Sequence, residues 1–273
     1  MKHLGSKILK GTVILASCLT FGVLLFLIAY ILIKGLPNLS PKLFSLHYTT
    51  ENASMLPAII NTIEMTLCSL IVAVPLGICT AIYLVEYAKK GNRVVGIIRI
   101  TAETLSGIPS IVYGLFGMLF FVTYLKWGYS ILAGAATLAI MVLPLIMRTT
   151  EEALLAVSDS YREASFGVGA GKLRTVFKIV LPAAMPGILS GVILAIGRIV
   201  GETAALIYTA GTVAEVSKGL LSSGRTLAIH MYVLSSEGLY TNQAYATAVV
   251  LLIFVLIINF MSSLVAKKFA AKD

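Results

Sequence analysis

Two opposite charges, Arg198 and Glu202, stand in the stretch GRIVGETAAL, which is otherwise among the most apolar parts of this sequence. An ionised side chain at the centre of a bilayer costs about 2.5–3.5 kcal/mol on insertion scales. Arg198 cannot lower that cost by losing its proton, because the pKa of arginine lies above about 12. In a continuous helix, Glu202 would lie on the same face and reach Arg198. The pair therefore predicts either an ion pair that holds helices together or part of an anion path.

Arginine suits the second role because its planar guanidinium donates two parallel hydrogen bonds, which match the geometry of an oxyanion. Small residues at helical spacing share the face of the two charges, and such residues let another helix backbone approach closely. The stripe consists of Gly187, Gly191, Ala195, Arg198, Glu202 and Ala205. We therefore expect both charges to face the interior of a helix bundle rather than lipid.

Composition indicates an integral membrane protein. Of the 273 residues, 58% are hydrophobic and 12% are charged, and the mean hydropathy is +0.96. Soluble domains carry about 25% charged residues. The sequence predicts a single all-α transmembrane domain over residues 1–273, with no soluble enzyme domain and no enzymatic activity. Segments long enough to span a bilayer are Thr12–Ile33, Ile59–Tyr83, Leu105–Leu125, Ile131–Met147, Val180–Leu206 and Ala244–Val265.

The distribution of positive charge predicts the orientation of these six spans. Most of the 21 lysines and arginines fall on one side of the predicted membrane if both termini are cytoplasmic, as expected for cytoplasmic loops. Residues 148–179 then form a cytoplasmic loop, and residues 207–243 form an external loop with helical periodicity in its second half. The net charge of +9 is explained by this asymmetry. No basic patch with interleaved aromatic residues indicates nucleic-acid binding.

Neither cofactor chemistry nor an ATP site is expected in this chain. Cys18, Cys68 and Cys79 lie in apolar runs, without the spacing of a disulfide framework or a metal site. The sequence GVGAGK contains a Gly-Lys pair, but a P-loop needs glycine where Phe166 stands and Ser or Thr where Leu173 stands. We therefore expect no cofactor and no metal.

The 148–179 loop has the local pattern of a short helix on the membrane surface. Ser160 and Glu163 have the spacing of a capping box, and Tyr161, Ala164 and Val168 recur at helical intervals. By itself this pattern is also typical of an ordinary connecting helix.

The longer spacing in this loop resembles the EAA motif of ABC-importer permeases. Glu163, Ala164 and Ser165 precede Gly169 by three residues, and Ile179-x-Leu181-Pro182 follows nine residues later, with Ser165 where the family usually has alanine. The resemblance implies a coupling helix that docks on a separate ATPase subunit. The candidate coupling residues are Ser160, Tyr161, Arg162, Glu163, Ala164, Ser165 and Gly169.

Four further stretches resemble the phosphate-import permeases, in particular the PstA-type subunit, although the PstC-type subunit shares several of them. They are NTIEMTL at Asn61–Leu67, AIYLVEYA at Ala81–Ala88, SGIPSIVYGLFG at Ser106–Gly117, and GRIVGETAAL at Gly197–Leu206. The resemblance implies a six-span type I importer permease, multi-pass in the lipid of a bacterial cell membrane, that forms half of a path for phosphate.

The same resemblance implies the partners and the roles of the two charges. A second six-span permease of the PstC type, two ATPase subunits of the PstB type and an external phosphate-binding protein of the PstS type are expected. Arg198 would line the path. Glu202 would compensate the Arg198 charge when the path is empty, and it would limit affinity so that phosphate leaves.

Three alternatives remain open at this stage. The same architecture serves other oxyanions, such as sulfate, molybdate or phosphonate. A proton-coupled secondary transporter could use Glu202, Glu64 and Arg198, and a membrane sensor or scaffold would need no anion path. Glu64 and Glu103 each fit either a path or a membrane interface, while His47 and His230 are expected to be solvated.

Overall fold

The structure is a computed structural model that describes residues 2–89, 91–238 and 240–270, and all its regular elements over these residues are helical. A long first helix, α1 (Lys2–Gly35), precedes two single 3-10 turns, Leu36–Asn38 and Pro41–Phe44. The remaining α-helices are α2 (Leu56–Ile82), α3 (Arg93–Ser106), α4 (Ser110–Gly117), α5 (Ile131–Ala156), α6 (Asp159–Gly167), α7 (Lys172–Thr175), α8 (Leu181–Val200), α9 (Ala204–Ile207), α10 (Leu227–Ser236) and α11 (Thr241–Ala270). Three wider π-helical turns extend α2, α4 and α7 over Tyr83–Tyr87, Met118–Tyr124 and Val176–Val180.

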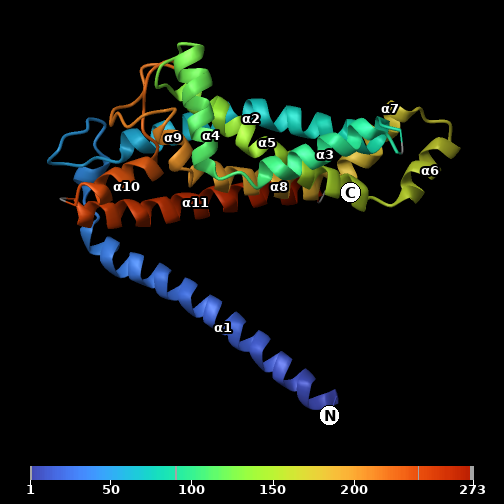
Figure 1. Ribbon diagram of the computed structural model, residues 1–273, viewed down its shortest axis with the longest axis horizontal. Helices are drawn as coiled ribbons and strands as arrows, with labels where there is room; N and C mark the ends of the chain where they lie inside the picture. Colours follow the sequence, from blue (N-terminus) through green and yellow to red (C-terminus); the bar gives the residue numbers. More distant parts are fainter. Residues whose placement is uncertain (1, 90, 239, 271–273) are drawn as a thin grey trace.

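The long helices α2, α5, α8 and α11 run side by side, with α3 along the same direction (Figure 1). Helix α5 lies between α2 and α8 and is the most buried of the candidate spans. Its apolar side chains, including Leu138, Met141 and Ile146, form the centre of the largest core cluster. Helices α6 and α7 lie at one end of this bundle, and α9 and α10 lie at the other (Figure 1). The bundle therefore has two ends, one formed by α6 and α7 and the other by α9 and α10.

The all-α fold with six spans is confirmed, although the third span differs from its prediction. Five helices are long and apolar enough to cross a membrane, and a sixth span results if α3 and α4 are counted as one bent pair. The predicted continuous span Leu105–Leu125 is instead broken between Ser106 and Ser110, where the two helices meet at 101°. Pro109 explains the break, because proline lacks an N–H and excludes the preceding residue from helical geometry.

The predicted fifth span, Val180–Leu206, also ends early. Helix α8 ends at Val200, and Gly201, Glu202 and Thr203 connect it to the single turn of α9. The carboxylate of Glu202 accepts a hydrogen bond from the backbone N–H of Ala205 at 3.0 Å. A side-chain oxygen that binds the first N–H groups of a new turn competes with continuation of the old helix, and the low helix propensity of Gly201 favours the same break.

Helix α1 extends away from the other helices and joins them only near its C-terminal end (Figure 1). Its apolar window has no buried residue. Contact begins where Tyr30 meets Tyr245 of α11 and where Gly35 lies against the same part of α11. A side chain at Gly35 would overlap the backbone carbonyl of Tyr245, so glycine permits this crossing.

Candidate functional site

Arg198 and Glu202 do not lie on one helix, so the prediction of an i,i+4 pair is wrong. Arg198 occupies the last turn of α8 and is partly exposed, whereas Glu202 follows the helix end and is buried. Among the ion pairs of the described residues, none joins the two side chains. The break at Gly201 separates them, and the Glu202 carboxylate is used to hold α9. Arg198 is favoured instead by the negative end of the α8 dipole.

Two of the quoted sequence stretches pack together beside Arg198. Gly114 of α4 lies so close to Ala205 of α9 that a Cβ at position 114 would stand 2.7 Å from the Ala205 Cα. Tyr113, the residue before this glycine, is buried, donates a hydrogen bond from its hydroxyl to the carbonyl of Leu105 at 2.8 Å, and lies within electrostatic range of Arg198. The α4–α9 contact therefore forms one wall next to the guanidinium.

The small-residue stripe of α8 faces α5 over part of its length. Side chains at Gly187 and Gly191 would overlap Ala153 and Thr149, and Ala195 is fully buried. This confirms that the first half of the stripe lies in the bundle interior. Gly197 lies on another face of α8, where a Cβ would meet no atom within 4 Å. On the stripe itself, Ala195 is fully buried and Arg198, one turn later, is partly exposed.

At the other end of the bundle, the α6–α7 segment (residues 157–180) contains the helix predicted for this loop. The residue that caps it is Ser158, whose hydroxyl accepts from the Ser160 N–H, so the expected capping box at Ser160 and Glu163 is wrong. Ser160 lies inside the first turn of α6. The sequence pattern did not distinguish the two possible caps, because Ser158 and Ser160 both precede the apolar repeat.

Part of the predicted coupling set faces outward. Tyr161 is 57% exposed and Val168 is 85% exposed, while Glu163, Ala164 and Ser160 are also exposed. Leu173 and Phe177 add further exposed apolar surface on the same segment. Gly169 has a φ of 85°, a left-handed conformation that glycine adopts without strain. The glycine of the motif therefore ends α6 and redirects the chain toward α7.

The other part of the set faces inward. The buried hydroxyl of Ser165 forms a 2.8 Å hydrogen bond with that of Thr175, which ties α6 to α7. Arg162 reaches away from the surface, and its guanidinium donates to Glu86 at 2.7 and 3.1 Å. It also donates to the carbonyls of Leu154 and Val157 at 3.0 and 2.8 Å, and to Asp159 at 3.1 Å. Sequence spacing gave no signal for the Arg162–Glu86 pair, because 76 residues separate its partners.

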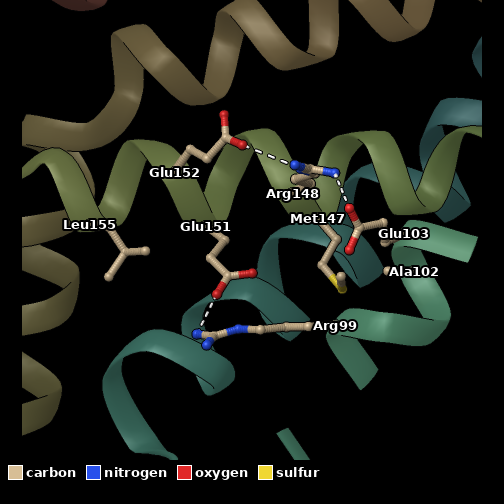
Figure 2. A pocket seen from close by; sticks show the side chains of 8 residues that line it. All are labelled: Arg99, Ala102, Glu103, Met147, Arg148, Glu151, Glu152 and Leu155. Carbon is tan, nitrogen blue, oxygen red and sulfur yellow. Dashed lines mark hydrogen bonds and ion pairs between the residues drawn. The ribbon is translucent and has the colours of Figure 1, made fainter. Parts of the chain in front are cut away.

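A cleft of about 300 Å³ lies between α3 and α5. Figure 2 shows Arg99 of α3 paired with Glu151 of α5, while Arg148 of α5 points toward Glu103 and Glu152. Arg148 lies 3.3 Å from Glu152 and 3.9 Å from Glu103, and all three side chains are more than half exposed. Exposed pairs of this kind contribute little stability. The charged cleft is a product of helix packing and was missed in the sequence.

At the end of the bundle opposite α6, the α9–α10 loop (residues 208–226) is fixed to α2. The buried amide of Asn61 donates to the carbonyls of Glu215 and Arg225 at 3.0 and 3.2 Å and accepts from the Ser217 N–H at 3.0 Å. The Ser217 hydroxyl donates to Glu64 at 2.6 Å. Glu64, left open by the sequence, therefore contacts this loop.

Helix α10 closes the same end, and the expectation that His230 is solvated is wrong. His230 is fully buried on α10, with its ring edge against Tyr48, and Arg225 lies over the same tyrosine ring at 4.6 Å. Burial, with the nearby Arg225 charge adding to it, lowers the pKa of His230 to about 3. The sequence offered no partner for His230 because Tyr48 is distant along the chain. His47 is exposed as expected.

Comparisons with known proteins agree with this architecture. Residues 73–272 match the family described as binding-protein-dependent transport system inner membrane component. The chain is 31% identical to the probable ABC transporter permease protein YqgI of Bacillus subtilis, over 99% of both chains. It is 33% identical to the phosphate transport system permease protein PstA of Haemophilus influenzae, over 85% of this chain and 83% of that one. A phosphate transport system permease protein PstA 2 of Mycobacterium bovis is 37% identical, over 76% of this chain and 70% of that one.

Solved structures agree on the fold. A bacterial alginate ABC transporter, in complex with an alginate-bound periplasmic protein, matches with a TM-score of 0.64 and 15% identity over 94% of both chains. The MetNI methionine ABC transporter in an inward-facing conformation matches with a TM-score of 0.60 and 19% identity, over 79% of this chain and 94% of that one. Fold and sequence together define a permease subunit of an ABC importer, a class that is not itself enzymatic.

The chain belongs to the binding-protein-dependent transport system inner membrane component family and, within it, to the PstA-type permeases. It is a multi-pass protein of the bacterial cell membrane. The family resemblance read from the 163–182 motif and the four further stretches is confirmed. Members of this class work with an ATPase and a substrate-binding protein.

Proposed function

We propose that this chain is one membrane-spanning half of an ATP-driven importer of inorganic phosphate. The observation that carries the proposal is the set of PstA relatives, of which the chain covers most of the length. Its partners would be a second six-span permease of the PstC type, two PstB-type ATPase subunits and an external PstS-type phosphate-binding protein. The residues 1–273 would act as one permease domain, with both termini in the cytoplasm.

Arg198 is the residue that we assign to the phosphate path. It is a partly exposed cation at the end of an apolar helix, and no described ion pair occupies its guanidinium. Its free fork suits a phosphate oxygen pair. A counterpart on the second permease would complete the site.

Glu202 takes a different role from the one its spacing suggested. Its carboxylate binds the Ala205 N–H and thereby fixes the start of α9, which packs against α4. We propose that Glu202 maintains the chain break that leaves Arg198 at a helix end. Its negative charge still lies near the path and would limit phosphate affinity, so that the anion leaves.

The outward side chains of α6 would form the docking surface for the ATPase subunit. Tyr161, Glu163 and Ala164 lie on the exposed side with Val168, and Ser160 borders them. Exposed apolar residues rimmed by polar ones mark interaction sites. Gly169 would shape this surface through its turn, Ser165 would tie α6 to α7 beneath it, and Arg162 would support it rather than touch the ATPase.

Phosphate uptake by vesicles that contain the assembled four-protein transporter tests the path. Arg198→Gln should lower uptake by at least about tenfold, because charge-assisted hydrogen bonds contribute about 1.5–3 kcal/mol. Lys218→Gln removes an equally positive but exposed side chain from the α9–α10 loop and should leave uptake within twofold. Intact uptake in Arg198→Gln would refute a path role and would favour a sensor or scaffold.

The same vesicles separate the remaining alternatives. ATP-dependent uptake of phosphate that sulfate, molybdate and phosphonate do not inhibit is expected. Uptake that is driven by a proton gradient without the ATPase subunit would instead identify a secondary transporter. Strong inhibition by one of the other oxyanions would reassign the substrate while leaving the permease class intact.

A further inference from the structure

The Glu86–Arg162 pair joins the α6–α7 segment to the end of α2 through an unusually complete set of bonds. Only 8% of the Glu86 side chain and 14% of the Arg162 side chain are exposed. Arg162 makes two hydrogen bonds to Glu86 and three more to the end of α5 and the start of α6. A buried, multiply bonded pair is held far more firmly than an exposed one. Movement of α6 is therefore transferred to the turn of the chain that carries Glu86.

A second contact holds the same turn from the other side of the segment. The Lys172 ammonium of α7 lies over the ring of Tyr87 at 5.2 Å, next to Glu86 in the chain. The Ser165–Thr175 hydrogen bond ties α6 to α7, so both contacts belong to one connected unit. Glu86 and Tyr87 lie in the π-helical turn Tyr83–Tyr87, which continues α2. The α6–α7 segment thus contacts the end of α2 at two points.

The opposite end of α2 is hydrogen-bonded to the α9–α10 loop. Asn61 bonds the loop at Glu215, Ser217 and Arg225. Glu64 accepts from Ser217, and the Thr62 hydroxyl accepts from the Leu227 N–H at 2.9 Å, where α10 begins. Asn61 and Glu86 stand 25 positions apart on one helical stretch, Leu56–Tyr87, which corresponds to about 38 Å.

We propose that α2 is a transmission rod and that the Glu86–Arg162 pair is the bond through which the α6–α7 segment moves it. Displacement of α6 would shift the end of α2, and the helix would carry that shift to the α9–α10 loop. Helix α2 and its π-helical turn form one span from Leu56 to Tyr87 although Pro75 lies within it, and helices of this kind are among the elements that carry coupling between distant sites. Glu86 and Arg162 are positioning residues for transport, and this role rests on the proposed docking of an ATPase at α6.

The test uses the assembled transporter in vesicles and measures ATP hydrolysis and phosphate uptake together, with and without phosphate-loaded binding protein. In Glu86→Gln we expect the ATPase subunit to stay bound and basal hydrolysis to remain within twofold. Uptake should fall at least tenfold, and stimulation of hydrolysis by the loaded binding protein should disappear. The ATP consumed per phosphate would then rise, because uptake falls by a larger factor than hydrolysis does, a change that a purely structural role does not produce.

Two further variants make the result decisive. Glu152→Gln removes a carboxylate from the exposed pair with Arg148 and should leave the coupling ratio within twofold. Arg162→Lys keeps the charge but cannot bond Glu86 and both carbonyls at once, so it should give an intermediate ratio. An unchanged ratio in both Glu86→Gln and Arg162→Lys would overturn the proposal, and so would loss of the ATPase subunit from both variants. A wild-type complex without an ATPase subunit would instead refute the proposed function.

Discussion

At one end of α2 the α6–α7 segment turns Tyr161, Val168 and Leu173 outward, whereas at the other end the α9–α10 loop leads to buried Arg225 and His230. The first segment is attached to the bundle by the polar contacts of Arg162 and Lys172 and by the buried side chains of Val176 and Val180. The second is fixed by a dense set of backbone-directed bonds from Asn61 and Thr62. The sequence predicted a docking role for the first loop from its EAA spacing and left the role of the second open.

This contrast teaches which end is made to receive a partner. Apolar side chains left in water at α6 favour association, because a partner would remove them from solvent. Polar side chains buried under α10 favour a fixed local structure, because each bond lost there leaves an unpaired buried group. Variants at the α9–α10 loop should therefore change stability, and variants at α6 should change association.

The largest effect is expected for Asn61→Ala. This change leaves the carbonyls of Glu215 and Arg225 and the Ser217 N–H without their partner, at about 1 kcal/mol or more for each group. The melting temperature of the purified protein in detergent should fall by roughly 10 °C. Asn38→Ala, which removes a single local bond to Lys34, serves as the control and should change it by less than about 3 °C. Equal effects of the two variants would contradict a rigid α9–α10 loop.

The next largest effect is expected for Val168→Asp. A charge at this exposed apolar position should weaken association with the ATPase subunit by about 2 kcal/mol, or roughly 30-fold, as at interface hot spots. The melting temperature should not change. Val213→Asp places the same charge at an exposed valine of the α9–α10 loop, and ATPase binding, measured by co-purification and titration, should be unaffected. Reversed results would exchange the assigned roles of the two ends.

A pH dependence should arise from His230. Its folded pKa of about 3 lies below its usual 6.5, so the unfolded chain gains a proton first as the pH falls. Stability is complete above pH 6.5 and is lost progressively down to about pH 3, with a loss of about 2 kcal/mol at pH 5. Melting curves of His230→Leu should lose this component between pH 6.5 and 5. His47→Gln, at an exposed histidine, should retain it; a wild-type slope in His230→Leu would exclude His230 as its source.

The smallest effect is expected for Ser165→Ala, which restores the residue usual in the family. The Thr175 hydroxyl loses its bond to Ser165 but keeps the Gly171 carbonyl at 3.2 Å. The cost should stay below about 1 kcal/mol, and ATPase association should remain within twofold. Ser236→Ala, at an exposed position of α10, should change neither. A large loss of ATPase binding in Ser165→Ala would mean that this bond shapes the docking surface.

Much of the fold was predictable from particular local signals. The apolar runs around Leu138 and Val249 each had the length of a span, and both form long helices. The helical spacing of Tyr161, Ala164 and Val168 predicted a short helix that α6 largely matches, because this spacing and the position of Gly169 are local properties. Pro109, one of the prolines that can kink a helix, carried a local signal for the break in the third span.

Other features depended on contacts that no spacing encodes. Arg198 and Glu202 have the i,i+4 spacing of a pair, but the α4–α9 contact through Gly114 and the bond from Glu202 to Ala205 stabilise a chain break between them. His230 became buried because Tyr48 and Arg225 pack around it. Arg162 was assigned to the docking surface through the resemblance of its loop to the EAA motif, whereas the structure pairs it with Glu86.

The sequence by itself determined the class of this protein, since hydrophobic length and motif spacing are properties of the chain that folding does not alter. The tertiary structure decided where the charges act. Arg162 faces Glu86, Arg198 stands at a helix end without a described ion partner, and Glu202 holds the turn that follows. Such assignments arise from packing between distant segments, because the energy of a charge depends on which groups surround it rather than on its neighbours in sequence.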